Sequence, residues 1–267
     1  MSLSERPEQF ADVRKHLPFL ARHEGLACLL ERLLCYPEIR QAFADSAGEQ
    51  NPFSGVARRL GLEIRVEDLA ERIPKNGPVV VVANHGFGGS DALALKAIMH
   101  DLRDDFKVLA NREVVLLPGM ADTVFPVSIL DQDNTRENAA SLRAMLRHVK
   151  RGGSLGVFPA GRVAYWKGDR MVDPPWNEHI VKLLQRMNAT IVPLWFYGKP
   201  PAGINFLSRL SGFVRTALIP TGLAKMKGQE IVARAGEPFE SSELRKNGEQ
   251  AGAWLRRKVE SLSVLGN

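Results

Sequence analysis

The segment Ala83–Asp91 places a histidine and an aspartate on either side of a glycine-rich stretch. His85 and Asp91 are six positions apart, and three of the four residues 86–89 are glycine. Glycine lets the backbone turn sharply, so the Asp91 carboxylate can fold back onto the imidazole. A carboxylate that accepts one ring N–H fixes the tautomer and leaves the other nitrogen free to take a proton. The spacing predicts a general base, His85, oriented by Asp91. The alternative is that His85 ends a strand and Asp91 caps a helix.

The remaining chemistry-bearing residues argue against several other classes of site. Ser90 does not lie in a Gly-x-Ser-x-Gly turn, which argues against a serine hydrolase. The other histidines show no metal-ligand spacing with cysteine or acidic residues, so we expect no metal site. Aromatic residues make up only 7% of the chain, and no stacking motif accompanies the basic charge, so we expect no nucleic-acid partner. The formal charge of +6 favours other anionic partners, such as phosphate groups or acidic lipid surfaces.

Short apolar runs alternate with amphipathic stretches over most of the chain, and they must position the His85 segment. Strands are predicted at 78–83, 106–110, 123–127, 154–158, 190–197 and 230–234, and helices after Asp91, from Asn134 to the Gly152-Gly153 pair, at 177–187 and around Trp254 to Leu262. Asn134 and Glu137 form a capping-box pattern. This rhythm predicts an α/β fold with a mainly parallel central sheet flanked by helices, and ligands at the carboxyl ends of its strands.

The N-terminal part of the chain is expected to be helical. We predict a helical segment over residues 1–49 and an enzyme domain over 50–267. Residues 17–36 suit one amphipathic helix, or two helices broken near Gly25, with Cys28 and Cys35 on one face and unable to form a disulfide. This stretch and residues 203–227, which carry both apolar and basic side chains, are candidates for contact with a membrane surface. The alternative for both is packing against the core, as most such stripes do.

Neither a secretory leader nor a spanning helix is indicated. The first residues contain no apolar core of a leader, and no window of about 18 residues is free of charge. If the protein contacts a membrane, we expect it to do so at the membrane surface and without spanning the bilayer. We therefore expect a cytoplasmic protein, peripherally associated with the inner face of the cell membrane.

The histidine segment resembles the His-x-x-x-x-Asp block of glycerolipid acyltransferases. It resembles most the variant, one residue longer, of the haemolysin-like lysophospholipid and lyso-ornithine-lipid acyltransferases. Further blocks stand in the order of that family, and the likeness covers about residues 50–240. These blocks are Leu109–Arg112, Val157–Gly161, Asp173–Trp176 and Val192–Gly198.

The resemblance implies an O-acyltransferase that moves a fatty acyl group from acyl carrier protein or coenzyme A to the hydroxyl of a lysolipid. It implies that His85 deprotonates the acceptor and that Asp91 stabilises the resulting imidazolium. No cofactor, metal or covalent intermediate is expected beyond the acyl thioester itself. The residues that it implies for substrate binding are Asn111, Arg112, Phe158, Pro159, Gly161 and Arg162.

The block Phe158–Ala164 departs from the family in its charge. Glycerol-phosphate enzymes carry Phe-Pro-Glu-Gly-Thr-Arg-Ser there, and the haemolysin-like branch carries Phe-Pro-Ala-Gly-Glu-Val-Ser, whereas this chain has Arg162 in place of an acid. A guanidinium suits an anionic head group or the phosphate of the donor. The alternative for Arg162 is a solvated surface side chain, and for Arg112 it is a structural ion pair.

The departure leaves two other functions open. One is the same fold acting on a non-glycerolipid hydroxyl or amine. The other is a non-catalytic protein that binds lipid or acyl carrier, against which the paired His85 and Asp91 argue.

Overall fold

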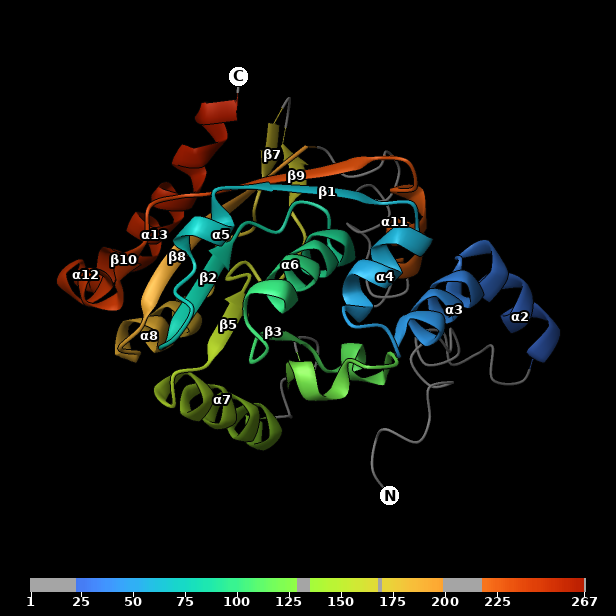
Figure 1. The fold of residues 1–267 in the computed structure, drawn as a ribbon, viewed down its shortest axis with the longest axis horizontal. Coiled ribbons are helices and arrows are strands. Elements are labelled where there is room, and N and C mark those ends of the chain that lie inside the picture. The colour runs from blue at the N-terminus through green and yellow to red at the C-terminus, as the bar shows by residue number, and fades with distance from the viewer. Residues whose placement is uncertain (1–22, 129–134, 168–169, 199–217, 267) are drawn as a thin grey trace.

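The computed structural model describes residues 23–128, 135–167, 170–198 and 218–266. These residues form a central eight-stranded sheet with helices on both faces (Figure 1). The strand order is β1-β9-β8-β2-β5-β3-β4, and β10 pairs with β8. The strands are β1 (Glu63–Glu67), β2 (Val79–Ala83), β3 (Lys107–Asn111), β4 (Val124–Val127), β5 (Ser154–Val157), β8 (Thr190–Tyr197), β9 (Glu230–Ala235) and β10 (Phe239–Glu240).

Most strand pairs in this sheet are parallel, which confirms the predicted fold class. The exceptions are β8 with β9 and β8 with β10, which pair antiparallel. The sequence analysis missed β1, which pairs with β9 in parallel at the edge of the sheet. It also missed a separate hairpin of β6 (Tyr165–Lys167) and β7 (Arg170–Val172). The strands β2, β5, β3 and β4 are mutually parallel, so their carboxyl ends meet at one edge.

The central strand β2 shows why helices must cover both faces. All five of its residues are buried, and alternate side chains point to opposite faces of a strand. Val79 and Val81 belong to one hydrophobic cluster, and Val80 and Val82 belong to the other. A strand buried on both sides reads as a continuous apolar run, as this one does.

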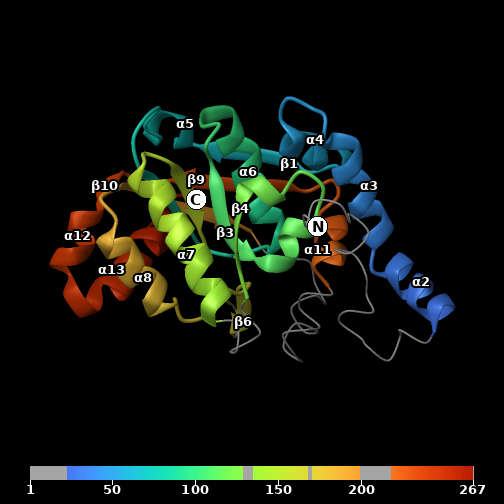
Figure 2. The ribbon, with the colours of Figure 1, turned by 90° about the horizontal axis from the view of Figure 1, so that it is seen from below.

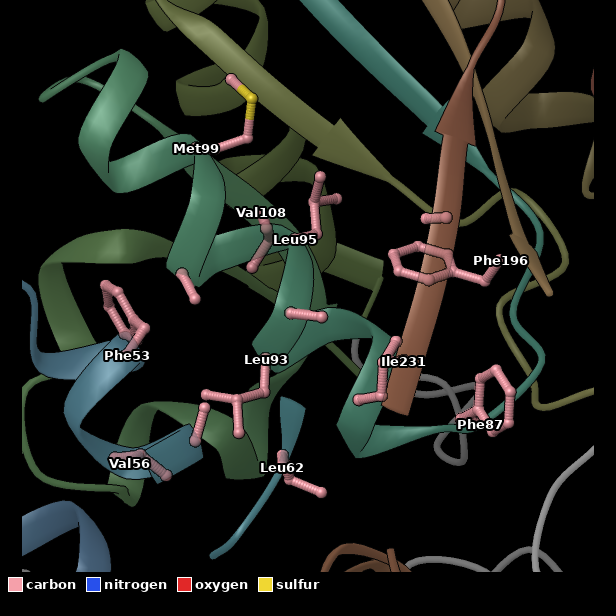
Figure 3. Close-up of a cluster of buried hydrophobic side chains, with 14 of the residues drawn as sticks. Phe53, Val56, Leu62, Phe87, Leu93, Leu95, Met99, Val108, Phe196 and Ile231 are labelled. Atoms are coloured by element: carbon pink, nitrogen blue, oxygen red, sulfur yellow. The ribbon is translucent and has the colours of Figure 1, made fainter. Parts of the chain in front are cut away.

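The helices divide between these two clusters. The first cluster receives side chains from α3 (Tyr36–Ser46), α4 (Pro52–Arg59), α5 (Leu69–Arg72), α6 (Gly89–Leu102) and α11 (Ile219–Lys225). The second receives them from α7 (Thr135–Lys150), α8 (Glu178–Arg186), α12 (Ser241–Lys246) and α13 (Ala251–Glu260). Figure 2 shows α4 and α5 toward one side of the molecule and α8 and α13 toward the other. Figure 3 shows Phe53 of α4 beside α6, which carries Leu95 and Met99 of the first cluster.

Short 3-10 helices complete the described chain: η4 (Arg112–Leu116), η5 (Ala121–Thr123), η6 (Gly248–Gln250) and η7 (Ser261–Gly266). The predicted N-cap Asn134 lies outside the described residues, as does most of the 203–227 stretch. The described end of that stretch is α11, which buries Pro220, Thr221 and Leu223. None of the described helices is long and apolar enough to cross a bilayer.

The helix α2 (Glu24–Leu33) begins one residue before Gly25, close to the predicted break, and residues 17–22 lie outside the described residues. A break that the sequence did not predict falls at Cys35, whose backbone is left-handed with φ 62°. Pro37 follows in the first turn of α3, where a proline starts a helix but cannot continue one. The two cysteines therefore do not share one helix face, and both are free thiols. The domain division at residue 49 stays a prediction.

Candidate functional site

The turn between β2 and α6 carries the predicted base. Asn84, the first residue after β2, locks this turn to the neighbouring strand β8, because its amide donates to the Phe196 carbonyl at 3.1 Å and accepts the Phe196 N–H at 2.7 Å. Gly88 precedes α6 with φ 72°, a left-handed conformation that glycine adopts without strain. The chain thereby reverses direction between His85 and the first turn of α6.

This reversal brings the imidazole of His85 onto the carboxylate of Asp91. Nδ1 of His85 lies 3.0 Å from Oδ1 and 3.1 Å from Oδ2 of Asp91. The Asp91 side chain is fully buried, and it also accepts the backbone N–H of Phe87 at 2.9 Å and of Ala92 at 2.7 Å. A carboxylate removed from water needs such donors, and three groups supply them here. The local contact predicted from the spacing is therefore present.

The surroundings of His85 strengthen it as a base. Burial lowers the pKa of the imidazole. The charge and hydrogen bond of Asp91, together with the charge of Asp173, raise this pKa by more than burial lowers it, so the net pKa lies above the ordinary value. With Nδ1 held by Asp91, Nε2 is the nitrogen left to exchange a proton. The side chain is 18% exposed, so it is not sealed from an incoming molecule.

The Phe158–Ala164 loop lies directly against this histidine. Phe158 follows β5, the neighbour of β2, and its ring centroid lies 4.6 Å from that of His85 with the planes tilted by 31°. The N–H of Ala164 donates to the His85 carbonyl at 2.7 Å. Gly161 turns the loop with φ 62°, and its N–H donates to the Phe158 carbonyl at 2.9 Å. Two motifs far apart in the sequence thus form one site.

A second carboxylate, not predicted as a site residue, reaches the same histidine. Asp173 is buried, its Oδ1 accepts the backbone N–H of His85 at 3.2 Å, and its Oδ2 accepts the indole N–H of Trp176 at 3.2 Å. The sequence signal was the Asp173–Trp176 block. That block does not show where the carboxylate points, because the contact spans 88 residues.

The comparison with known families identifies the chain. The sequence profile of the family described as Acyltransferase matches residues 63–197, just over half of the 267 residues. The protein belongs to the Acyltransferase family. It is therefore an acyltransferase-family enzyme, and the matched region contains His85, Asp91, Phe158 and Asp173.

One curated relative and one solved structure add to this assignment. The chain is 26% identical over 145 residues to the lyso-glycine lipid O-acyltransferase of Phocaeicola vulgatus, and the alignment covers 52% of this acyltransferase and 49% of the relative. The chain therefore spans about half the length of that relative. The crystal structure of the 1-acyl-sn-glycerophosphate (LPA) acyltransferase PlsC from Thermotoga maritima superposes with a TM-score of 0.50 at 16% identity, covering 94% of each chain. The latter likeness concerns the fold.

The other residues predicted to bind substrate lie at several places around this site. Asn111 ends β3, which neighbours β5 at the same sheet edge, and Pro159 accepts the N–H of Asn177 at 2.8 Å. Arg112 pairs with Glu137 of α7 at the surface, in agreement with the structural ion-pair alternative. Arg162 is exposed within the Phe158–Ala164 loop. Within the described ranges, no group of three or more His, Cys, Asp or Glu side chains is arranged to hold a metal.

Replacing Asp91 by asparagine should lower the pKa of His85 to below 6.5. The opposite charge that favours the imidazolium is lost, whereas the burial that opposes it remains. NMR titration of the His85 imidazole in the wild-type enzyme and in Asp91→Asn measures both values, with the resonances of His179 as the internal control. A His85 pKa unchanged by the substitution would show that Asp91 does not set its basicity.

Proposed function

We propose that this acyltransferase moves a fatty acyl group from the thioester of acyl carrier protein or coenzyme A to the hydroxyl of a lysolipid. The observation that carries the proposal is the contact between His85 Nδ1 and the buried Asp91 carboxylate at the carboxyl edge of the sheet. A base held by a carboxylate is what removal of a hydroxyl proton requires. The Phocaeicola vulgatus relative, named for a lyso-glycine lipid, supports a single-chain lipid acceptor.

In the proposed mechanism, the Asp91 carboxylate accepts a hydrogen bond from the Nδ1–H of His85, and Nε2 takes the proton of the acceptor hydroxyl. The acceptor oxygen then attacks the thioester carbonyl and forms a tetrahedral intermediate. Asp91 stabilises the imidazolium formed in this step. The C–S bond breaks as the intermediate collapses, and the proton on Nε2 passes to the leaving sulfur. Acceptor and donor react directly, with no acyl-enzyme intermediate and no metal.

The neighbouring loop is proposed to bind the substrates. Phe158 lies against the imidazole, and Pro159 and Gly161 shape the turn that leads to Arg162. Because Arg162 is exposed, its guanidinium is available for an anionic head group or the donor phosphate. Asn111 lies at the same sheet edge, whereas Arg112 is already engaged by Glu137 and is the weaker candidate. Residues 50–267 are proposed as the acyltransferase domain.

A single-chain lipid lies in bilayers, so the enzyme must reach their surface, and we propose α2 in the 1–49 segment as the contact. Three leucines spaced for one helix face are exposed: Leu26 at 45%, Leu29 at 53% and Leu33 at 65%. An adjoining side of α2 packs through Ala27 and Leu30. Figure 1 shows α2 at the periphery, beyond α3. This arrangement favours peripheral association with the inner face of the cell membrane.

Substitution of His85 by alanine should reduce acyl transfer by roughly 10²- to 10⁴-fold, the contribution of a positioned base. The assay is release of free thiol from long-chain acyl-coenzyme A and acyl carrier protein, with a panel of lysophospholipids and lyso-aminolipids. The matched control is His179→Ala, an exposed histidine in the first turn of α8.

Near-normal transfer by a folded His85→Ala enzyme would refute the mechanism. Thioester retained by the wild-type protein without release of thiol, whatever the acceptor, would indicate a binding protein instead. Thiol release only with a non-glycerolipid hydroxyl or amine would keep the chemistry and change the acceptor.

Substituting Leu26, Leu29 and Leu33 together by serine should weaken binding to lipid vesicles. The polar side chains remove apolar surface that would enter the interface, while the packed side of α2 stays intact. Sedimentation with anionic phospholipid vesicles measures the change. The control is Val264→Ser, which replaces an apolar side chain outside α2 that is 75% exposed. Equal binding by the triple variant and the wild type would rule out α2 as the contact.

A further inference from the structure

The His85 site contains a buried carboxylate to which the mechanism gives no role. Asp173 precedes α8, with two prolines between it and Trp176. Its two oxygens take different donors, the His85 N–H on Oδ1 and the Trp176 indole on Oδ2. Because a carboxylate only accepts hydrogen bonds, the ionised form satisfies both donors, and protonation of either oxygen gives up an acceptor.

The backbone around Asp173 is held independently of His85. The Arg256 guanidinium of α13 donates to the carbonyl of Asp173 at 3.1 Å and to that of Pro174 at 3.4 Å. On the other side, the N–H of Asn177, the N-cap of α8, donates to the Pro159 carbonyl at 2.8 Å. The carboxylate is thus presented to His85 from a segment fixed to both α13 and the Phe158–Ala164 loop.

The His85 backbone is consequently held at both of its polar groups. Asp173 takes its N–H, and Ala164 donates to its carbonyl. The imidazole is held separately by Asp91. Three contacts from three segments therefore determine where the histidine lies, and only the one with Asp91 is local in sequence.

We propose that Asp173 is a positioning residue for the base. Its carboxylate fixes the His85 backbone, and its negative charge favours the imidazolium that forms when Nε2 takes the acceptor proton. This role rests on the proposed function of His85.

Two charged groups adjoin the imidazole among the described residues: Asp91 from α6 and Asp173 from the segment before α8. Both raise the pKa of His85 against the effect of burial, and Asp173 does so less than Asp91. Burial raises the pKa of Asp173 itself, and the N–H donors and the charge of His85 oppose that rise. The Phe158 ring, from the end of β5, adds no charge.

Asp173→Asn tests the proposal, because it keeps the size of the side chain and removes its charge. We expect kcat to fall by about tenfold to a hundredfold, the effect of a small displacement of a reacting group, with little change in KM. The acidic limb of the kcat/KM profile should move to lower pH, and the His85 pKa measured by NMR should fall in parallel, by less than in Asp91→Asn. Asp173→Glu, which retains the charge, should restore the His85 pKa more fully than the rate.

An unchanged His85 pKa in a folded Asp173→Asn enzyme would overturn the proposal, even if activity fell together with thermal stability. If Asp173→Asn does not fold, the wild-type enzyme still gives the answer. The amide ¹⁵N–¹H resonance of His85 should shift as the Asp173 carboxyl titrates above its ordinary pKa, and no such step would equally overturn the proposal. If the wild-type protein shows no transferase activity but the His85 pKa still falls in Asp173→Asn, the proposed function is refuted and the contact between Asp173 and His85 is kept.

Discussion

A buried carboxylate cannot be left without donors, and the sharp turn between β2 and α6 supplies them to Asp91. The side chain is removed from water, and its charge is stable there only because two backbone N–H groups and the His85 imidazole point at it. Those donors converge because the backbone reverses at Gly88 with a left-handed φ. The basicity of His85 and the geometry of the turn therefore have a common cause. A substitution of Asp91 or Gly88 is therefore expected to disturb both the turn and the basicity of His85.

The parallel sheet brings the rest of the site to this turn. β5 lies beside β2, so the residue after β5, Phe158, lies against the residue that follows β2 by two positions, His85. β8 lies on the other side of β2 and is tied to the turn through Asn84. Neighbouring strands that end at one edge are the usual setting for ligand sites in such sheets. The fold thus explains why motifs tens of residues apart lie at one place.

The sequence predicted the local features well and the distant ones poorly. The His85–Asp91 contact was predictable because it closes over six residues with glycines between them, and β2 because it is buried on both faces. The break at Cys35 was missed because glycine invites a helix break more than cysteine does, although Pro37 was a signal. The strand β1 was missed although its charged residues alternate with Ile64 and Val66, a pattern typical of an edge strand that is buried on one face only. Asp173 was missed as a site residue because its direction depends on contacts with α13 and the Phe158–Ala164 loop.

The central claim is that the neutral imidazole of His85 acts as the base and that Asp91 raises its basicity. Its most direct test compares the pKa of the acidic limb of kcat/KM with the pKa of the His85 imidazole measured by NMR in the same wild-type enzyme. The account predicts that the two values coincide and lie above 6.5, because the charges of the neighbouring carboxylates outweigh burial. Transfer that stays constant while the imidazole titrates would contradict it.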